Sequence, residues 1–158
     1  PPGLVVYAVS ARAIERAGGI EERGFLLDFL KAKKGLADGK TPATPCVPLV
    51  FALSHQLDRI AKEGMDGRWQ RHLDMQSHTL EWAAVNGFEP FVDEGFRSPT
   101  VTTLRAPGRD IMDLAARAKA AGFAMDKGYG KLKGQAFRIG HMGDHTVERV
   151  QRLLAALL

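Results

Sequence analysis

The segment Phe137–Gly143, with the sequence FRIGHMG, contains the side chain best suited to chemistry in this sequence. Arg138 lies within an apolar run that we expect to form a strand, and a buried guanidinium is costly unless an anion neutralises it. The planar fork of arginine matches a carboxylate bidentately. The residue types support two partners for Arg138 equally: the carboxylate of a ligand, or an Asp or Glu of the chain itself.

The loop Thr41–Pro45, with the sequence TPATP, is a second candidate. Proline biases the preceding residue toward extended geometry, so we expect both threonines to be extended. We expect Thr44 and Pro45 to be the N-cap and first residue of the next helix. A hydroxyl beside the free N–H groups of a helix start can bind an anion, although a simple cap is the commoner role of such a threonine.

Other common chemical signatures are missing or weak. His141 and His145 lie four residues apart, but Gly140 and Gly143 break the helical register that a metal pair of this spacing needs, so we expect no metal site. The glycine-rich stretch from residue 128 is too short for a nucleotide-binding loop. Cys46 is the only cysteine, which excludes a disulfide scaffold and fits a reducing, cytoplasmic compartment.

Composition narrows the classes further. The chain has 158 residues, of which 45% are hydrophobic and 25% charged, and its net charge is +4. This length suits one domain with a short extra segment and excludes a large multidomain enzyme. The lysines at residues 31–34 are followed by Asp38, so we expect a solvated face and no nucleic-acid partner. No apolar run approaches the roughly 20 residues that cross a bilayer.

The N-terminal part is expected to be a strand followed by helices. Leu4–Val9 is a short run rich in β-branched residues and predicts a buried strand, one that belongs to a different sheet from the C-terminal strands and is separated from its neighbours. Ser10 is expected to cap a helix over Ala11–Ala17, whereas residues 23–40 are ambiguous. Two longer helices are expected at 45–63 and 66–86, the second with Asp66 as its cap.

After Gly87 the hydrophobic period changes to that of an α+β unit. We expect an edge strand at 88–91, strands at 99–104, 123–125 and 135–139, a helix at 109–121, and a terminal helix capped by Asp144. The order β-β-α-β-β-α predicts helices packed on one face of a small sheet.

Three motifs in this order resemble one family. They are Pro1-Pro-Gly-Leu4, the loop Thr41–Pro45 with its apolar helix, and the segment Phe137–Gly143. The chain is similar over its whole length to the class V aminotransferases of fold type I, an α/β fold, and most similar to the alanine/serine–glyoxylate branch. The resemblance implies a homodimer that depends on pyridoxal 5'-phosphate (PLP). It also implies amino-group transfer from a small amino acid, serine or alanine, to a 2-oxo acid, glyoxylate or pyruvate.

The resemblance also assigns roles within the chain. Residues 1–65 would be the end of the PLP-binding large domain with its linking helix, and 66–158 the small C-terminal α+β domain. The Schiff-base lysine would lie upstream of Pro1, so this chain would hold no catalytic residue and be inactive alone. Arg138 would grip the substrate α-carboxylate. Thr44 would reach the PLP phosphate of the neighbouring subunit, and Thr41 is the second cofactor-binding candidate, at a position held by tyrosine in some relatives.

Two other readings use different residues. The run Lys31–Lys40 with Lys131 and Lys133 fits a mildly basic, non-enzymatic α+β module that binds RNA or an acidic partner. The helices expected over 45–86 fit an assembly element that dimerises without any cofactor.

Overall fold

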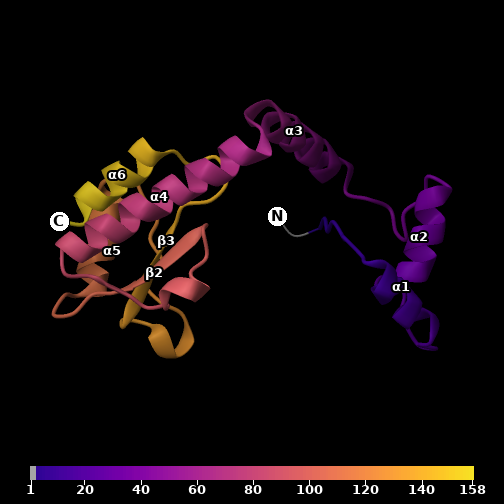
Figure 1. The fold of residues 1–158 in the computed structure, drawn as a ribbon, viewed down its shortest axis with the longest axis horizontal. Coiled ribbons are helices and arrows are strands. Elements are labelled where there is room, and N and C mark those ends of the chain that lie inside the picture. Colours follow the sequence, from indigo (N-terminus) through magenta and orange to yellow (C-terminus); the bar gives the residue numbers. More distant parts are fainter. Residues whose placement is uncertain (1–2) are drawn as a thin grey trace. The chain divides into compact units, whose positions relative to one another are not determined.

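The computed structural model describes residues 3–158 (Figure 1). Pro1 and Pro2, which belong to the Pro-Pro-Gly motif, lie outside the described residues. The chain divides into two compact units, Pro1–Lys62 (unit 1) and Glu63–Leu158 (unit 2), and each is described by itself. Within residues 3–158, no helix combines the length and the apolar character needed to span a membrane.

Unit 1 consists of helices joined by irregular segments. It contains α1 (Ala11–Gly18), α2 (Phe29–Ala37) and all but the last residue of α3 (Val47–Glu63). Ser10 caps α1 as predicted, because its side chain accepts a hydrogen bond from the Ala13 amide at 3.2 Å. The ambiguous stretch 23–40 resolves into α2, whose start is set by Asp28, which accepts from the amides of Leu30 and Lys31.

The predicted buried strand at Leu4–Val9 is wrong. This segment has no strand assignment, and Val5 and Val6 are 65% and 75% exposed. A strand needs a neighbouring chain to take up its backbone N–H and C=O groups, and the described part of the chain pairs no segment with residues 4–9. Residues 4–9 therefore have the β-branched composition of a strand but not its hydrogen bonds to a neighbouring strand.

Unit 2 has the predicted α+β architecture, with one three-stranded antiparallel sheet in the order β1-β2-β3. Its elements, in chain order, are α4 (Met65–Val85), β1 (Glu89–Pro90), η1 (Glu94–Phe96), β2 (Val101–Arg105), α5 (Ile111–Ala120), η2 (Gly130–Leu132), β3 (Ala136–Gly140) and α6 (Val147–Ala156). The short β1 lies at the edge as predicted, because Pro90 has no N–H for a central ladder. Figure 1 shows α4 and α6 side by side over the sheet.

The core of unit 2 lies between the sheet and its three long helices. Register places Leu104 of β2 opposite Phe137 of β3, and both side chains are fully buried. Ile139, two residues further along β3, is buried on the same face. The helices contribute Met75 and Ala83 from α4, Ile111, Leu114 and Ala118 from α5, and Val150, Leu153 and Leu154 from α6.

Three local predictions in unit 2 are wrong. Asp66 lies inside α4, which follows Gly64 without a side-chain cap. Thr146, not Asp144, caps α6 by accepting from the Arg149 amide at 3.3 Å, because the Asp144 carboxylate is instead paired with Arg68 at 3.1 Å. Residues 123–125 form no strand, and the chain there makes only an isolated bridge from Asp126 to β3.

The central position of Phe137 predicts a large stability effect. Phe137→Ala should lower the free energy of unfolding of unit 2 by about 3–5 kcal/mol, because a fully buried ring is replaced by a cavity. Chemical denaturation followed by far-UV circular dichroism measures this. Phe96→Ala is the control, because Phe96 is 84% exposed and should change stability by no more than about 0.5 kcal/mol. Equal losses in the two variants would contradict the proposed core.

Candidate functional site

Arg138 occupies the middle of β3, with its side chain directed away from the core. Phe137 and Ile139 on either side of it are buried, whereas the Arg138 side chain is 51% exposed. Successive side chains of a strand point to opposite faces of the sheet. Because Phe137 and Ile139 face the core, Arg138 lies on the opposite face, which we call the open face. The expectation that Arg138 is buried in an apolar strand is therefore wrong, and its desolvation cost is small.

Asp126 pairs with Arg138 through two hydrogen bonds. Nε of Arg138 donates to Oδ2 of Asp126 at 2.8 Å, and Nη2 donates to Oδ1 at 3.0 Å. The hydrogen bond from Arg138 is the main reason that the pKa of Asp126 lies below its usual value. Of the two partners that the sequence left open, the internal carboxylate is thus the one seen. Nη1 makes no hydrogen bond to any of residues 3–158.

A glycine turn holds Asp126 in place. Oδ2 of Asp126 also accepts a hydrogen bond from the Gly128 amide at 3.1 Å. Gly128 has φ +85°, and a Cβ at this position would lie 2.2 Å from the Leu132 carbonyl oxygen, so only glycine fits. Sequence reasoning missed Asp126, although the sequence Asp-x-Gly is a recognisable signal of a turn.

Thr44 does not cap α3. The amides of Leu49 and Val50 donate to the Cys46 carbonyl at 3.0 and 3.1 Å, so Cys46 is the N-cap residue and the helix begins at Val47. Pro48 is tolerated in the first turn because an N–H there has no helical partner. The predicted helix start at Pro45 is therefore wrong by two residues, and Thr44 lies in the loop before the helix.

The two threonines differ in their capacity to bind a phosphate. The Thr41 hydroxyl donates to the Ala43 carbonyl at 2.7 Å, so its proton is already engaged. Thr44 is exposed and makes no side-chain hydrogen bond within the described part of the chain. A free hydroxyl close to the start of a helix suits a phosphate group, so Thr44 could donate a hydrogen bond to such an anion more readily than Thr41.

His141 is buried and helps to hold the end of β3, the strand that carries Arg138. It lies just after β3, is fully buried, and its Nε2 is 2.8 Å from Oγ1 of Thr102 on β2. Its Nδ1 is buried without a hydrogen-bond partner in residues 3–158. Burial is the main cause that lowers the pKa of His141 below its usual value, and the nearby His72 acts in the same direction. The neutral ring therefore ties the end of β3 to β2.

The turn after β3 is held from α4. Arg71 donates to the carbonyl of Gly143 at 3.1 Å and to that of His145, and Nε2 of His72 lies 3.3 Å from the Gly143 carbonyl. Glu63 in turn accepts from Arg71 at 2.7 Å. This network fixes the course of the chain between Arg138 and α6. It serves as structural support.

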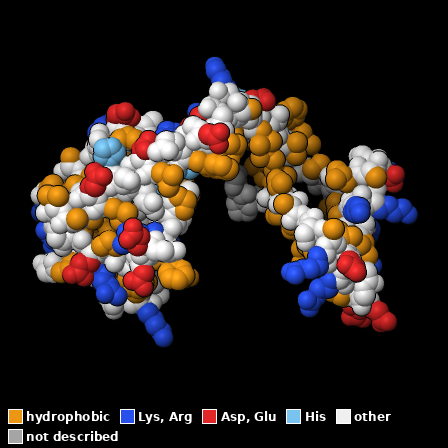
Figure 2. Space-filling view, in the orientation of Figure 1, with side chains coloured by type: hydrophobic (Ala, Val, Ile, Leu, Met, Phe, Trp, Pro, Cys, Tyr) orange, Lys and Arg blue, Asp and Glu red, His pale blue; other side chains and the backbone are white. Residues whose placement is uncertain are grey.

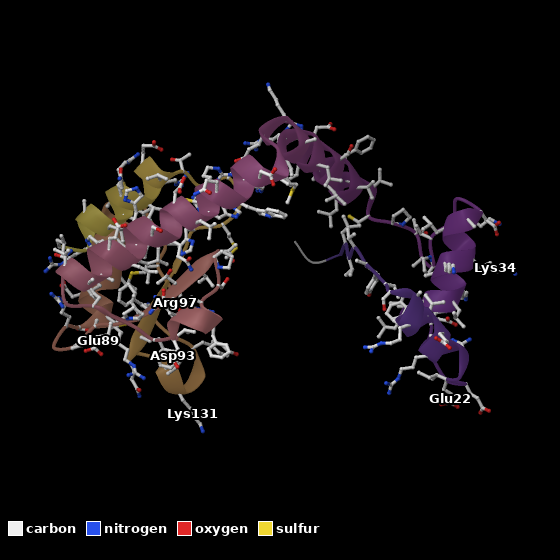
Figure 3. The ribbon with its side chains drawn as sticks, in the orientation of Figure 1. Glu22, Lys34, Glu89, Asp93, Arg97 and Lys131 are labelled. Atoms are coloured by element: carbon white, nitrogen blue, oxygen red, sulfur yellow. The ribbon has the colours of Figure 1, made fainter. Side chains whose placement is uncertain are left out.

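The remaining candidates do not assemble into a site. Across residues 3–158, no group of three or more His, Cys, Asp or Glu side chains is arranged to hold a metal ion. Lys34 lies on α2 of unit 1, whereas Lys131 lies on the loop of η2 in unit 2 and extends into solvent (Figure 3). The lysines that suggested RNA binding thus belong to different units.

Comparison with known proteins adds independent information. No family model matches the chain. An uncharacterized aminotransferase of Methanocaldococcus jannaschii is 37% identical over 99% of this chain and 42% of its own length. The serine–glyoxylate aminotransferase of Methylorubrum extorquens is 32% identical over 91% of this chain and 38% of its own length. A protein named as the small subunit of a soluble hydrogenase, from Synechococcus, is 33% identical over 90% of this chain and 38% of its own length.

Solved structures agree with the sequence relatives. The alanine–glyoxylate aminotransferase of Nostoc superposes with a TM-score of 0.81 at 30% identity, over 94% of this chain and 41% of that chain. The chain spans about two fifths of the length of the curated relatives it matches.

The buried state of His141 predicts a pH dependence of stability. With its pKa lowered in the folded state, His141 stays neutral while the unfolded chain binds a proton as the pH falls below about 6.5. The free energy of unfolding of unit 2 should therefore fall between pH 7 and pH 5.5, by at most about 1.4 kcal/mol per pH unit from this residue.

Urea unfolding of wild type and His141→Asn at the two pH values measures this contribution. The variant should lose much of the slope in this window, whereas His55→Asn, at an exposed position, should keep it. An unchanged slope in His141→Asn would contradict the assignment. The carboxylates with lowered pKa, including Asp126, affect stability only below about pH 5, where the unfolded chain begins to protonate them, and so leave this window nearly unaffected.

Proposed function

We propose that this chain, whose homologues are class V aminotransferases of fold type I, forms the C-terminal part of a PLP-dependent aminotransferase. The complete enzyme would move an amino group from a small amino acid, serine or alanine, to a 2-oxo acid, glyoxylate or pyruvate. The observation that carries the proposal is Arg138, which stands on the open face of the sheet with its Nη1 free among residues 3–158.

Arg138 would bind the carboxylate that amino acids and 2-oxo acids share. A guanidinium offers paired N–H donors that match the two oxygens of a carboxylate. Holding this group fixes the position and orientation of the reacting carbon relative to the cofactor, which is a contribution to positioning. Because β3 is anchored by His141 and the turn that follows it by Arg71, the guanidinium projects from a rigid base.

PLP, when bound, supplies an electron sink for the bonds that change at the substrate Cα. The part of this task that falls to the present chain is small. Thr44 would donate its free hydroxyl to the cofactor phosphate, across the interface of a homodimer. We propose Thr41 only as a neighbour of that contact, since its proton is engaged by the Ala43 carbonyl. No lysine of this chain is proposed as the residue that binds the cofactor covalently.

The surface of unit 1 supports its role as part of a larger assembly. Ala17 is the only buried hydrophobic residue among residues 3–62, and Figure 2 shows hydrophobic side chains along α3. A groove of about 880 Å³ is lined mainly by apolar side chains, among them Val5, Tyr7 and Phe29. An exposed apolar surface of this kind marks an interface. We propose that the rest of the large domain and a second subunit cover it, with residues 1–65 in the large domain and 66–158 as the small domain.

The proposed role of Arg138 predicts a large kinetic effect. In the enzyme that contains this chain, Arg138→Ala should lower kcat/KM for serine or alanine on the order of 100-fold, because the paired donors to the carboxylate are lost. Arg138→Lys should fall between wild type and Arg138→Ala, since it keeps the charge without the fork. Steady-state transamination with glyoxylate measures both.

Arg117→Ala is the matched control. Arg117 is also a half-exposed arginine in an ion pair, with Asp113 on α5 at 2.8 Å. Its removal should leave kcat/KM unchanged within about twofold. Unchanged kinetics in Arg138→Ala would remove Arg138 from the site.

A further inference from the structure

We propose that Asp126 is a positioning residue, which holds one edge of the Arg138 guanidinium so that the opposite edge faces the substrate carboxylate. This inference rests on the proposed function of Arg138. The ion pair of Asp126 with Arg138 would then contribute to substrate binding.

A guanidinium has two edges that can each bind a carboxylate. The side edge presents Nε and one N–H of Nη2, and the end edge presents Nη1 and the other N–H of Nη2. Asp126 occupies the side edge, with distances of 2.8 Å to Nε and 3.0 Å to Nη2. The end edge is left for a second carboxylate, because Nη1 donates to no acceptor among residues 3–158. One arginine can therefore bind both carboxylates at once.

Asp126 is held by several contacts, so we do not expect a substrate carboxylate to displace it from Arg138. Its backbone forms a β-bridge directly opposite Arg138, and its Oδ2 also accepts from the Gly128 amide at 3.1 Å. The turn itself cannot shift freely, since Gly128 packs against the Leu132 and Ala136 carbonyls. A substrate that took the side edge would have to replace both hydrogen bonds between Arg138 and Asp126, while Asp126 stayed held beside the guanidinium by its bridge and by the Gly128 amide.

Two opposing effects decide the sign of the Asp126 contribution. Its negative charge repels a second carboxylate, but the side chains of Arg138 and Asp126 are 51% and 32% exposed, and the high dielectric constant of the surrounding water weakens this repulsion. Against that, a free arginine side chain must lose rotamer freedom when it binds, which weakens binding roughly three- to tenfold. Asp126 has already removed this freedom, so the net effect should favour the ligand.

The test is a titration of this chain with sodium acetate, followed by NMR of arginine side-chain N–H groups at constant ionic strength. In wild type, acetate should shift the Arg138 Nη signals and leave the Nε–H signal in its ion-paired position. In Asp126→Ala, the Nε–H signal should move toward that of a free arginine, and the acetate Kd should rise about three- to tenfold. Asp126→Asn, which keeps one acceptor oxygen, should fall between the two.

The control is Asp113→Asn, which removes the matched ion pair with Arg117 on α5 and should leave the acetate Kd unchanged. Tighter acetate binding in Asp126→Ala would overturn the inference, because Asp126 would then compete with the ligand. A shift of the wild-type Nε–H signal away from its ion-paired position on adding acetate would also overturn it, because acetate would then displace Asp126. If Asp126→Ala fails to give a folded amide spectrum, Asp126→Asn decides by the direction of its change in Kd.

The proposed function fails by a different result. If Arg138→Ala binds acetate as wild type does, or if acetate leaves every Arg138 signal of wild type unmoved, Arg138 is not a carboxylate site and the role of Asp126 falls with it. If Arg138→Ala loses acetate binding while Asp126→Ala does not weaken it, only the inference about Asp126 is overturned.

Discussion

The alternation of side chains along β3 is the constraint on which the rest of unit 2 depends. Phe137 and Ile139 point into the core formed with α4, α5 and α6, so Arg138 between them must point to the open face. A shift of register by one residue would bury the guanidinium and expose both apolar side chains. The same hydrophobic contacts that stabilise the unit therefore place the arginine at a defined point on its surface.

Polar contacts fix the end of β3 and the direction of the Arg138 side chain, which the hydrophobic core does not determine. On one side of β3, His141 bonds to Thr102, and the following turn is held by Arg71. On the other side, the turn at Gly128 carries Asp126 to the edge of the guanidinium. Arg138 is thus held at its backbone by the sheet and at its tip by an ion pair. The strand holds the backbone of Arg138 rigidly, and the loop that carries Asp126 sets the direction of its guanidinium.

Sequence predicted most where the signal is local. Hydrophobic periodicity located the helices of unit 2, and the resemblance carried by FRIGHMG singled out Arg138 among the arginines of the chain. Contacts between residues far apart in the sequence decided the features that were predicted wrongly or missed. The run Leu4–Val9 has the composition of a strand but lacks a pairing partner in the described structure, and Asp144 lost its expected capping role because Arg68 competes for its carboxylate. The pairing of Asp126 with Arg138 depends on a β-bridge across 12 positions, which no local pattern contains.

The central claim is that Arg138 binds a substrate carboxylate on the open face of the sheet. The most direct measurement is a crystal structure of the enzyme containing this chain with alanine or serine bound. We expect the substrate carboxylate at Nη1 and Nη2 of Arg138, with Asp126 still bonded to Nε. A substrate carboxylate held elsewhere, with Arg138 bonded only to Asp126, would contradict it.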